Sequence, residues 1–367
     1  MRTSRLVFLL FSLVVVSCTQ SKRLQKSQPS PAVPASKNTT SEAPPGHLMK
    51  PAAERTRQYF NKIEGKRIGI VANQTSLIGK VHLVDSLLSA GMQVVKVFSP
   101  EHGFRGQAEA GETVGNNTDV KTGLPLISLY GDHRKPTPED LTGIDLMLFD
   151  LQDVGTRFYT YISTLTLVME ACAENSLPLL ILDRPNPNGY FIDGPLLEPG
   201  YTSFVGMHAI PIVHGMTMAE YGRMVNGELW LKDSLLCDLD WVEVSGYNHK
   251  KHYSLPVRPS PNLPDMESVY LYPSLCLFEG TMVSVGRGTD LPFSIIGYPG
   301  YKGGNYRFTP ESREGASLNP TYKGMECSGY NLRNEVPDII TNPGIRLKWL
   351  ILMYNSYPEK TEFFTSF

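Results

Sequence analysis

Short apolar runs alternate with amphipathic stretches along the chain from about residue 66 onward. Branched apolar residues dominate these runs and predict buried strands. The runs are Lys66–Ala72, Met92–Phe98, Leu124–Leu129, Ile144–Phe149 and Leu177–Leu182, with Ala209–Val213 as one more candidate. Because nearly every position in them is apolar, they favour a parallel sheet that is covered on both faces.

Helical spacing appears between several of these runs. Val81–Ala90 has it and stops at Gly91, and Tyr161–Glu174 has it as well. Thr217–Leu229 is amphipathic and begins with a capping box, in which Thr217 is the N-cap and Glu220 follows three residues later. Strands that alternate with helices predict an α/β fold with a mostly parallel sheet.

A proline-rich passage, residues 255–264 (LPVRPSPNLP), interrupts this alternation. Its four prolines cannot continue a helix or a central strand, so we interpret it as a connector between domains. We predict an α/β domain over residues 49–258 and a smaller α/β domain over residues 259–367. The second domain is rich in glycine and aromatic residues and ends in an expected helix at Gly344–Tyr354.

The first 18 residues are typical of a bacterial lipoprotein signal. Arg2 and Arg5 precede the apolar stretch Leu6–Val16, which is too short to span a bilayer, and the run ends at a lipobox-like Cys18. An ordinary signal peptide with a chance cysteine is the alternative. Residues 19–48 are polar and predict a flexible tether. We therefore expect a protein of the cell envelope, lipid-anchored to the membrane through Cys18 and facing the periplasm rather than the cell surface.

Charge and motif content exclude several functions. The net charge of −2 and the absence of a basic stripe argue against nucleic acid as a partner. No GxGxxG follows the first strand, and neither HExxH nor GxSxG occurs, so we expect no nucleotide, no metal, no other cofactor and no serine-hydrolase elbow. The remaining cysteines read as buried thiols or an occasional bridge: Cys172, Cys237, Cys276 and Cys327.

Polar residues follow the predicted strands at the point where each strand ends. In a parallel sheet these ends share one rim, where ligands of open α/β folds bind. We therefore expect one cleft to collect Glu101, His102, Asp150, Asp153, Arg157, Asp183 and Arg184. A simpler reading of Asp150 and Asp183 is that they cap the next helix or pair with a nearby arginine.

Two charged positions stand out beyond this rim pattern. Glu101 lies in a Pro-Glu-His-Gly turn with a phenylalanine close behind, and partial burial of a carboxyl group suits a general acid. Glu279 and Arg287 lie in an otherwise apolar, glycine-rich passage of the second domain. They either form a buried pair that holds a turn or belong to a segment that closes over the cleft.

Seven runs in one order give the chain a specific resemblance. They are NQTSL, FSPEHGFRG, FDLQDVGTRFYTY, LDRPNPNG, PIVHGMT, RPSPNLP and LCLFEGTMVSVGRGTDLPF. This series resembles the bacterial exo-β-N-acetylmuramidase family and covers the chain from about residue 65 to its end. The resemblance implies a Rossmann-like domain, a smaller α/β domain and an active site in the cleft between them. It also implies release of N-acetylmuramic acid (MurNAc) from the non-reducing end of peptidoglycan fragments, by proteins that are secreted or lipid-anchored.

The resemblance also implies roles for residues. Glu101 matches the catalytic acid, and its catalytic partner is Asp150, Asp153, Glu279 or the N-acetyl group of the substrate itself. We assign catalysis to Glu101, Asp150 and Glu279, and substrate binding to Asn73, His102, Arg105, Asp153, Arg157, Tyr159, Asp183, Arg184 and Arg287. Arg157 or Arg287 is expected to read the lactyl carboxylate that distinguishes MurNAc from N-acetylglucosamine (GlcNAc).

One departure and two alternatives remain. The chain stops at FFTSF, earlier than the family pattern leads us to expect, so the last helices of the second domain are expected to be missing or replaced. A non-catalytic lipoprotein that binds muropeptides would use the same cleft without turnover. A carbohydrate esterase would need a nucleophile or a metal site that the sequence does not show.

Overall fold

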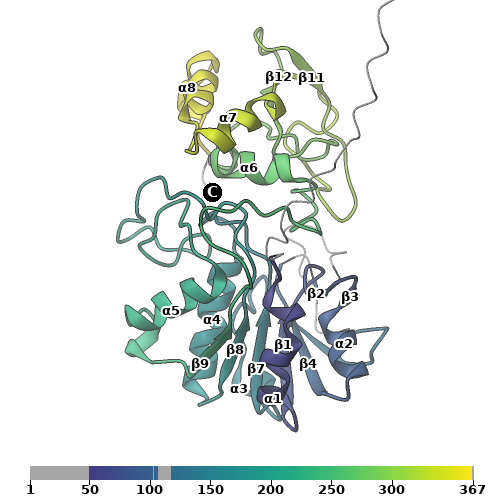
Figure 1. Cartoon of the computed structure of the whole chain (residues 1–367). Coiled ribbons are helices and arrows are strands. Elements are labelled where there is room, and N and C mark those ends of the chain that lie inside the picture. The colour runs from purple at the N-terminus through teal and green to yellow at the C-terminus, as the bar shows by residue number, and fades with distance from the viewer. Residues whose placement is uncertain (1–48, 102, 106–116, 366–367) are drawn as a thin grey trace, which may run out of the picture. The chain divides into compact units, whose positions relative to one another are not determined.

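A seven-stranded sheet forms the centre of the N-terminal domain (Figure 1). The computed structural model describes residues 49–101, 103–105 and 117–365. Six strands of the sheet (β6, β4, β1, β7, β8 and β9) run parallel to one another, and β5 pairs antiparallel with β6 at one edge. In spatial order the strands are β5 (Asn117–Thr118), β6 (Pro125–Ser128), β4 (Gln93–Ser99), β1 (Arg67–Ala72), β7 (Leu146–Asp150), β8 (Leu179–Leu182) and β9 (Leu239–Val242).

The order of the parallel strands is that of a Rossmann-type sheet. Starting from the central β1, the chain first adds β4 and β6 on one side and then β7, β8 and β9 on the other. The strand order therefore reverses between β1 and β7, and ligands of such folds bind outside the carboxyl ends of the strands near that point. This arrangement confirms the expected Rossmann-like, mostly parallel sheet.

Alternate residues of each strand pack into two separate cores, which explains why the strands are apolar throughout. Val71 and Phe149 belong to the larger core with helices α4 and α5, whereas Ile70 and Leu148 belong to the smaller one, which also holds residues of α1 and α2. Helices thus cover both faces of the sheet. The helices of this domain are α1 (Phe60–Ile63), α2 (Leu83–Ser89), α3 (Pro138–Leu141), α4 (Tyr161–Glu174) and α5 (Met218–Gly227).

Most predicted elements of this domain are present, and one is not. The predicted capping box begins α5, where the Thr217 hydroxyl accepts the Glu220 N–H at 3.3 Å and the Glu220 carboxylate accepts the Thr217 N–H at 2.8 Å. The candidate strand Ala209–Val213 was wrong. Pro211 interrupts this run and Val213 forms only isolated bridges, since proline cannot donate to a ladder. Strand β9 was not predicted.

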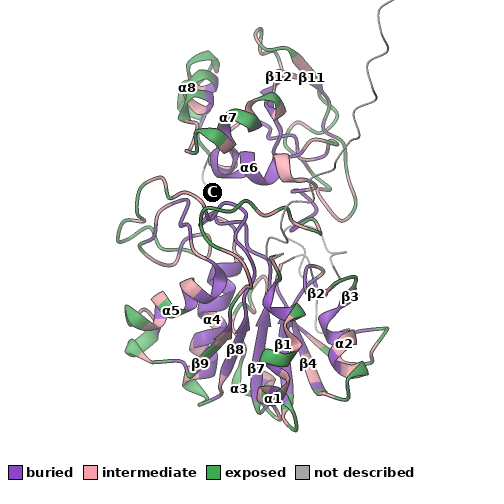
Figure 2. Cartoon of the chain, viewed as in Figure 1, coloured by how far each residue is buried: buried purple, intermediate pink, exposed green. Residues whose placement is uncertain are grey.

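The smaller C-terminal domain combines three helices with an antiparallel sheet. Its sheet has the order β10-β12-β11. Helix α6 is mostly buried (Figure 2), and its buried residues belong to the same core as those of α4 and α5, so one apolar core extends through both domains. The elements are α6 (Met266–Leu275), β10 (Ile295–Tyr298), β11 (Tyr306–Phe308), β12 (Cys327–Asn331), α7 (Val336–Thr341) and α8 (Leu347–Ser356). The expected last helix is therefore α8.

Short elements complete the described chain. A small antiparallel pair, β2 (Leu77–Ile78) and β3 (Val81–His82), lies between β1 and α2. Single-turn 3-10 helices occur at η1 (Ala52–Glu54), η2 (Thr56–Gln58), η3 (Lys232–Ser234), η4 (Cys276–Phe278), η5 (Arg333–Glu335) and η6 (Lys360–Glu362).

The proline-rich passage at residues 255–264 forms neither helix nor named strand, as expected of a connector. It is nevertheless fixed in place by hydrogen bonds. The Pro259 carbonyl accepts the Gln74 amide at 3.0 Å and the Tyr159 hydroxyl at 2.9 Å. Both donors follow strands of the sheet, so the connector is attached to the carboxyl-end rim of the N-terminal domain.

Several predictions concern other parts of the chain. The signal peptide with Cys18, the tether at residues 19–48 and His102 lie outside the described residues. None of the helices in the described ranges is long and apolar enough to cross a membrane. The cysteines at 172, 237, 276 and 327 are free thiols and buried, which agrees with the first of the two predicted readings.

Candidate active site

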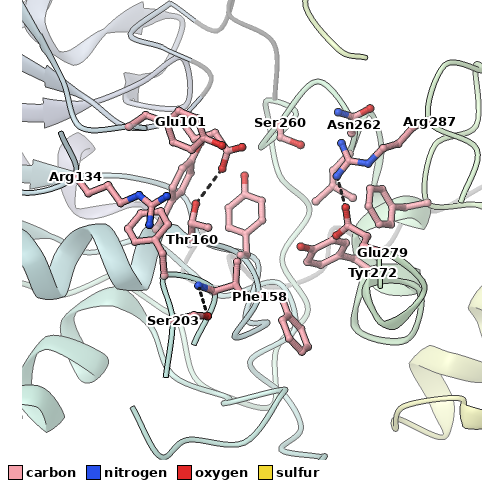
Figure 3. Close-up of a pocket in the computed structure, with 17 residues that line it drawn as sticks. Glu101, Arg134, Phe158, Thr160, Ser203, Ser260, Asn262, Tyr272, Glu279 and Arg287 are labelled. Atoms are coloured by element: carbon pink, nitrogen blue, oxygen red, sulfur yellow. Dashed lines mark hydrogen bonds and ion pairs between the residues drawn. The ribbon is translucent and has the colours of Figure 1, made fainter. Parts of the chain in front are cut away.

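A pocket of about 410 Å³ lies at the carboxyl ends of the parallel strands, where the connector and the C-terminal domain meet the sheet domain (Figure 3). Residues after β4, β6 and β7 form one side of it, and residues from α6 to Phe293 form the other. Its polar and aromatic wall includes Glu101, Tyr130, Arg134, Tyr159, Thr160, Tyr161, Ser260, Asn262, Tyr272, Glu279, Arg287 and Phe293.

Glu101 occupies a turn directly after β4. The turn is closed by a hydrogen bond from the Gly103 N–H to the Pro100 carbonyl at 3.1 Å, and Gly103 has a φ of +73°, which glycine adopts without strain. The half-buried Glu101 carboxylate accepts a hydrogen bond from the Thr160 hydroxyl at 3.2 Å. The turn and Thr160 together hold the carboxylate at the pocket.

Tyr130 lies next to Glu101 in the pocket wall. Burial and the neighbouring Glu101 carboxylate raise the pKa of the Tyr130 phenol to about 12, although Arg134 and Arg287 oppose the rise. The phenol is therefore neutral at physiological pH and available as a hydrogen-bond donor. Residues of both domains thus act on one hydroxyl group, which shows that the charges of the pocket are close enough to influence each other.

Glu279 and Arg287 enter the pocket from the C-terminal domain and form an ion pair. Their side chains are 19% and 29% exposed, and the Arg287 guanidinium also lies 5.1 Å from the centre of the Phe293 ring. Burial lowers the pKa of Arg287, but Glu279, Tyr272 and Glu101 outweigh it, so the net shift is upward. The guanidinium is therefore a permanent cation in the pocket.

Asp150 and Arg184 do not line this pocket. Their side chains are 0% and 3% exposed and form a bidentate ion pair, with nitrogen–oxygen distances of 2.6 and 2.8 Å. Arg184 also donates to the Leu77 carbonyl at 3.3 Å. The geometry corresponds to the simpler reading, in which Asp150 pairs with a nearby arginine, and it leaves the carboxylate without access to a substrate in this pocket.

Asp183 and Asp153 are also buried behind the site. The Asp183 carboxylate accepts the Ala219 N–H of the first turn of α5 at 3.0 Å, and burial raises its pKa to about 7. The Asp153 carboxylate accepts the Gly155 N–H at 2.6 Å and lies 3.4 Å from His214. Asp183 therefore interacts with the start of a helix, as its simpler reading proposed, and Asp153 stabilises a turn.

Two further predicted binding residues, Arg157 and Arg105, have structural partners. The Arg157 guanidinium donates to the carbonyls of Pro195 and Ile210, and burial lowers its pKa. Arg105 pairs with Asp119 at 2.7 Å. Neither arginine lines the pocket, so the structure does not place Arg157 where it could read a lactyl carboxylate there.

Asn73 and Tyr159 support the pocket in different ways. Asn73 is fully buried and donates to the hydroxyl of Tyr161 at 2.8 Å, so it holds a pocket residue from behind. Tyr159 lines the pocket itself and joins it to the connector through Pro259. Of the predicted site residues, those that the structure places in the pocket are Glu101, Tyr159, Glu279 and Arg287.

Several pocket residues were not predicted. Tyr130 and Arg134 follow the strand β6, so the strand-end rule would have found them if it had been applied after Leu124–Leu129. Ser260 and Asn262 belong to the RPSPNLP run, which was interpreted only as a connector. Thr160 and Tyr272 carried no comparable signal. Within the described residues, no group of three or more histidine, cysteine, aspartate or glutamate side chains is placed to hold a metal ion.

Comparison with known families gives two adjacent matches. The family described as "Exo-beta-N-acetylmuramidase NamZ, N-terminal" matches residues 68–267, and its C-terminal counterpart matches residues 270–367. The boundary between the two matches falls just after the proline-rich connector. The pocket residues are therefore contributed by both matched domains.

Comparison with individual proteins also finds similar sequences and structures. The chain is 40% identical over 354 residues to "Peptidoglycan beta-N-acetylmuramidase NamZ" of Bacillus subtilis (strain 168), covering 91% of this chain and 84% of that protein. Two crystal structures of DUF1343 family proteins from Bacteroides fragilis NCTC 9343 are also similar. One has a TM-score of 0.80, 47% identity and 86% coverage of both chains. The other has a TM-score of 0.69 and 29% identity, with 84% of this chain and 83% of that chain covered.

Proposed function

Because the chain belongs to the exo-β-N-acetylmuramidase NamZ family of glycoside hydrolases, we propose that it releases MurNAc from the non-reducing end of peptidoglycan-derived glycans. One observation carries the proposal at the level of chemistry. A single pocket receives a carboxylate from each domain, Glu101 from the sheet domain and Glu279 from the C-terminal domain (Figure 3). Glycoside hydrolysis commonly requires two such carboxylates.

We assign the role of general acid to Glu101, which protonates the glycosidic oxygen as the bond to the leaving sugar breaks. Thr160 and the Pro100–Gly103 turn fix its position, and Tyr130 adds a neutral phenol beside it. Proton donation by a positioned side chain typically accelerates a reaction by roughly 10²–10⁴-fold. Removal of the acid should therefore have a large effect on turnover and a small effect on stability.

Glu279 is the partner that the pocket geometry favours over Asp150 and Asp153, because those two carboxylates are buried and do not line the pocket. As the anion of an ion pair with Arg287, it is suited to stabilise positive charge at the anomeric carbon or to activate water. The N-acetyl group of the substrate is the remaining alternative. If it is the nucleophile, Glu279 orients that group instead of attacking.

The direct test uses the full-length chain, purified in mild detergent, with β-MurNAc and β-GlcNAc glycosides of a second sugar, whose leaving oxygen must be protonated as the bond breaks. We expect release from the MurNAc glycoside and a loss of at least about 100-fold in kcat for Glu101→Gln. The matched control is Glu326→Gln, an exposed glutamate that pairs with Arg307 outside the pocket. Release that survives Glu101→Gln would remove Glu101 from the acid role. No release by folded wild-type protein would favour a binding lipoprotein.

We also propose that the mature chain is held in the cell envelope by a lipid on Cys18, with the enzyme on the periplasmic side. The support is the sequence of residues 1–18, which combines a short basic segment, an apolar run and a lipobox-like cysteine. Growth with an alkyne fatty acid should label the wild type but not Cys18→Ser. Equal labelling of both proteins would contradict the anchor at this residue.

A further inference from the structure

Among the described residues, the guanidinium of Arg134 has no anionic partner at the pocket. Arg134 lies after β6 and lines the pocket on the same side as Glu101, with its guanidinium directed toward the interior (Figure 3). Its charge acts on the site, because it opposes the upward pKa shift of Tyr130. Among the described residues it forms no ion pair and no hydrogen bond. Its side chain is exposed and can therefore be reached by a ligand.

The other two candidate arginines are already occupied. Arg287 lines the pocket but forms an ion pair with Glu279, so part of its charge is compensated. Arg157 donates to the carbonyls of Pro195 and Ile210 and does not line the pocket. A substrate anion that enters the pocket would therefore compete with a protein partner at Arg287, but not at Arg134.

Phe204 orients the free guanidinium. The Arg134 guanidinium carbon lies 4.5 Å from the centre of the Phe204 ring, which is within the range of a cation–π contact. Such stacking leaves the edge of the guanidinium plane, with its N–H groups, available for hydrogen bonds. Arg134 and Phe204 also line a neighbouring hollow of about 420 Å³, so the two side chains stand on the border between both spaces.

We propose that Arg134, stacked on Phe204, is the residue that binds the carboxylate of the substrate and so sets the preference for MurNAc over GlcNAc. This inference rests on the proposed function, because the lactyl carboxylate is the group by which the two sugars differ. An arginine fork matches a carboxylate with two parallel hydrogen bonds. Arg134 touches the substituent and not the bond that breaks, so its contribution is to substrate binding.

The test is a cycle of two substrates and two proteins. Full-length wild type and Arg134→Ala, in mild detergent, are compared on an aryl β-MurNAc glycoside and on its lactyl methyl ester, which keeps the shape but loses the charge. We expect wild type to prefer the acid by about tenfold in kcat/KM, through KM, and Arg134→Ala to lose this preference. Arg134→Lys should keep part of it, since it retains the charge but not the fork.

Two controls and a binding measurement make the result decisive. Arg307→Ala removes an arginine outside the pocket and should leave the rate and the preference unchanged, and Arg287→Ala should lower both rates but keep the preference. Calorimetric titration with free MurNAc and its methyl ester measures the same preference without turnover. A preference retained by Arg134→Ala in either assay overturns the inference. Absence of hydrolysis by wild type overturns the proposed function, while the titration still decides the role of Arg134.

Discussion

Asp150–Arg184 and Glu279–Arg287 are two carboxylate–arginine pairs of the same chemistry in different surroundings. The first pair lies at the end of β7, with side chains 0% and 3% exposed, and the second lies in the pocket wall, with side chains 19% and 29% exposed. Because the first pair is buried, removal of one partner would leave the other charge with neither a counter-ion nor water. The stability of the fold therefore requires both partners. Partial exposure leaves the second pair able to exchange its partner for a substrate.

The comparison teaches that position after a strand does not by itself make a residue part of a site. Asp150 directly follows an apolar strand and was predicted to be catalytic, but its carboxylate turns into the fold toward Arg184. Glu279 follows no strand of the sheet and still reaches the pocket. Access of the side chain to the pocket therefore distinguishes the two pairs better than their place in the sequence.

The largest expected effect tests the buried pair. Arg184→Met leaves Asp150 charged, fully buried and without its partner, which should lower the free energy of unfolding by about 3–5 kcal/mol. Urea unfolding of the full-length chain measures this loss. Arg287→Met, the matched change in the partly exposed pair, should lower the free energy of unfolding by clearly less than Arg184→Met does. Equal losses in the two variants would show that burial is not what separates the pairs.

The second prediction tests the pocket pair by activity. Glu279→Gln keeps the size of the side chain but removes the charge, so we expect kcat on the MurNAc glycoside to fall by about 100-fold, with little change in urea stability. Asp150→Asn should show the opposite pattern, with a larger loss of stability than of specific activity in the folded fraction. A wild-type kcat in Glu279→Gln would leave the N-acetyl group of the substrate as the second catalytic group.

The third prediction concerns Asp183, a buried carboxyl group that forms no ion pair among the described residues. Burial raises the pKa of Asp183 to about 7, from an ordinary value of 3.8. Between these values the unfolded chain releases the proton while the folded chain keeps it, so this group makes stability fall as pH rises toward 7. Asp183→Asn keeps an acceptor for the Ala219 N–H but cannot titrate. Between pH 5 and 7 the free energy of unfolding should therefore fall by about 2 kcal/mol more in the wild type than in Asp183→Asn. Unfolding curves with parallel pH dependence in both proteins would contradict it.

The smallest expected effect concerns the support of Glu101. Thr160→Val removes the hydroxyl that donates to the Glu101 carboxylate at 3.2 Å, at nearly constant volume. One such hydrogen bond is worth about 1 kcal/mol, so kcat should fall by about fivefold while KM changes little. Thr160→Ser restores the hydroxyl and should restore kcat. A rate that Ser does not rescue would indicate a packing role for the Thr160 methyl group.

The sequence predicted the sheet well because its signal is local. Runs such as Ile144–Phe149 are apolar on both faces, and the alternation with helices permits few topologies, so the Rossmann-like order followed. The failure at Ala209–Val213 has a local cause too, since Pro211 was present in the run and removes a ladder hydrogen bond. Strand β9 is harder to foresee because Asp240 alternates with half-buried residues and weakens the apolar pattern.

The site was predicted less completely because the direction of a side chain is not local. The strand-end rule pointed to Glu101, the charges in the apolar passage pointed to Glu279 and Arg287, and the resemblance added Tyr159. All four side chains line the pocket. The rule could not tell that Asp150 turns inward, because this depends on Arg184, which follows a different strand. Arg134 was missed because the strand-end rule was not applied after Leu124–Leu129, although the polar run Asp132–Lys135 follows that strand.

The connector has a consequence for how this enzyme can be recombined with its relatives. Ser260, Asn262 and Leu263 line the pocket, and Pro259 is bonded to both Gln74 and Tyr159 of the sheet domain. The passage that looks like a neutral junction is thus a piece of the substrate pocket. Chimeras that exchange the smaller domain between homologues should keep their activity when the crossover falls after Leu263, at the start of α6. A crossover before Pro259 exchanges the connector part of the pocket wall as well and separates Pro259 from its native donors, Gln74 and Tyr159.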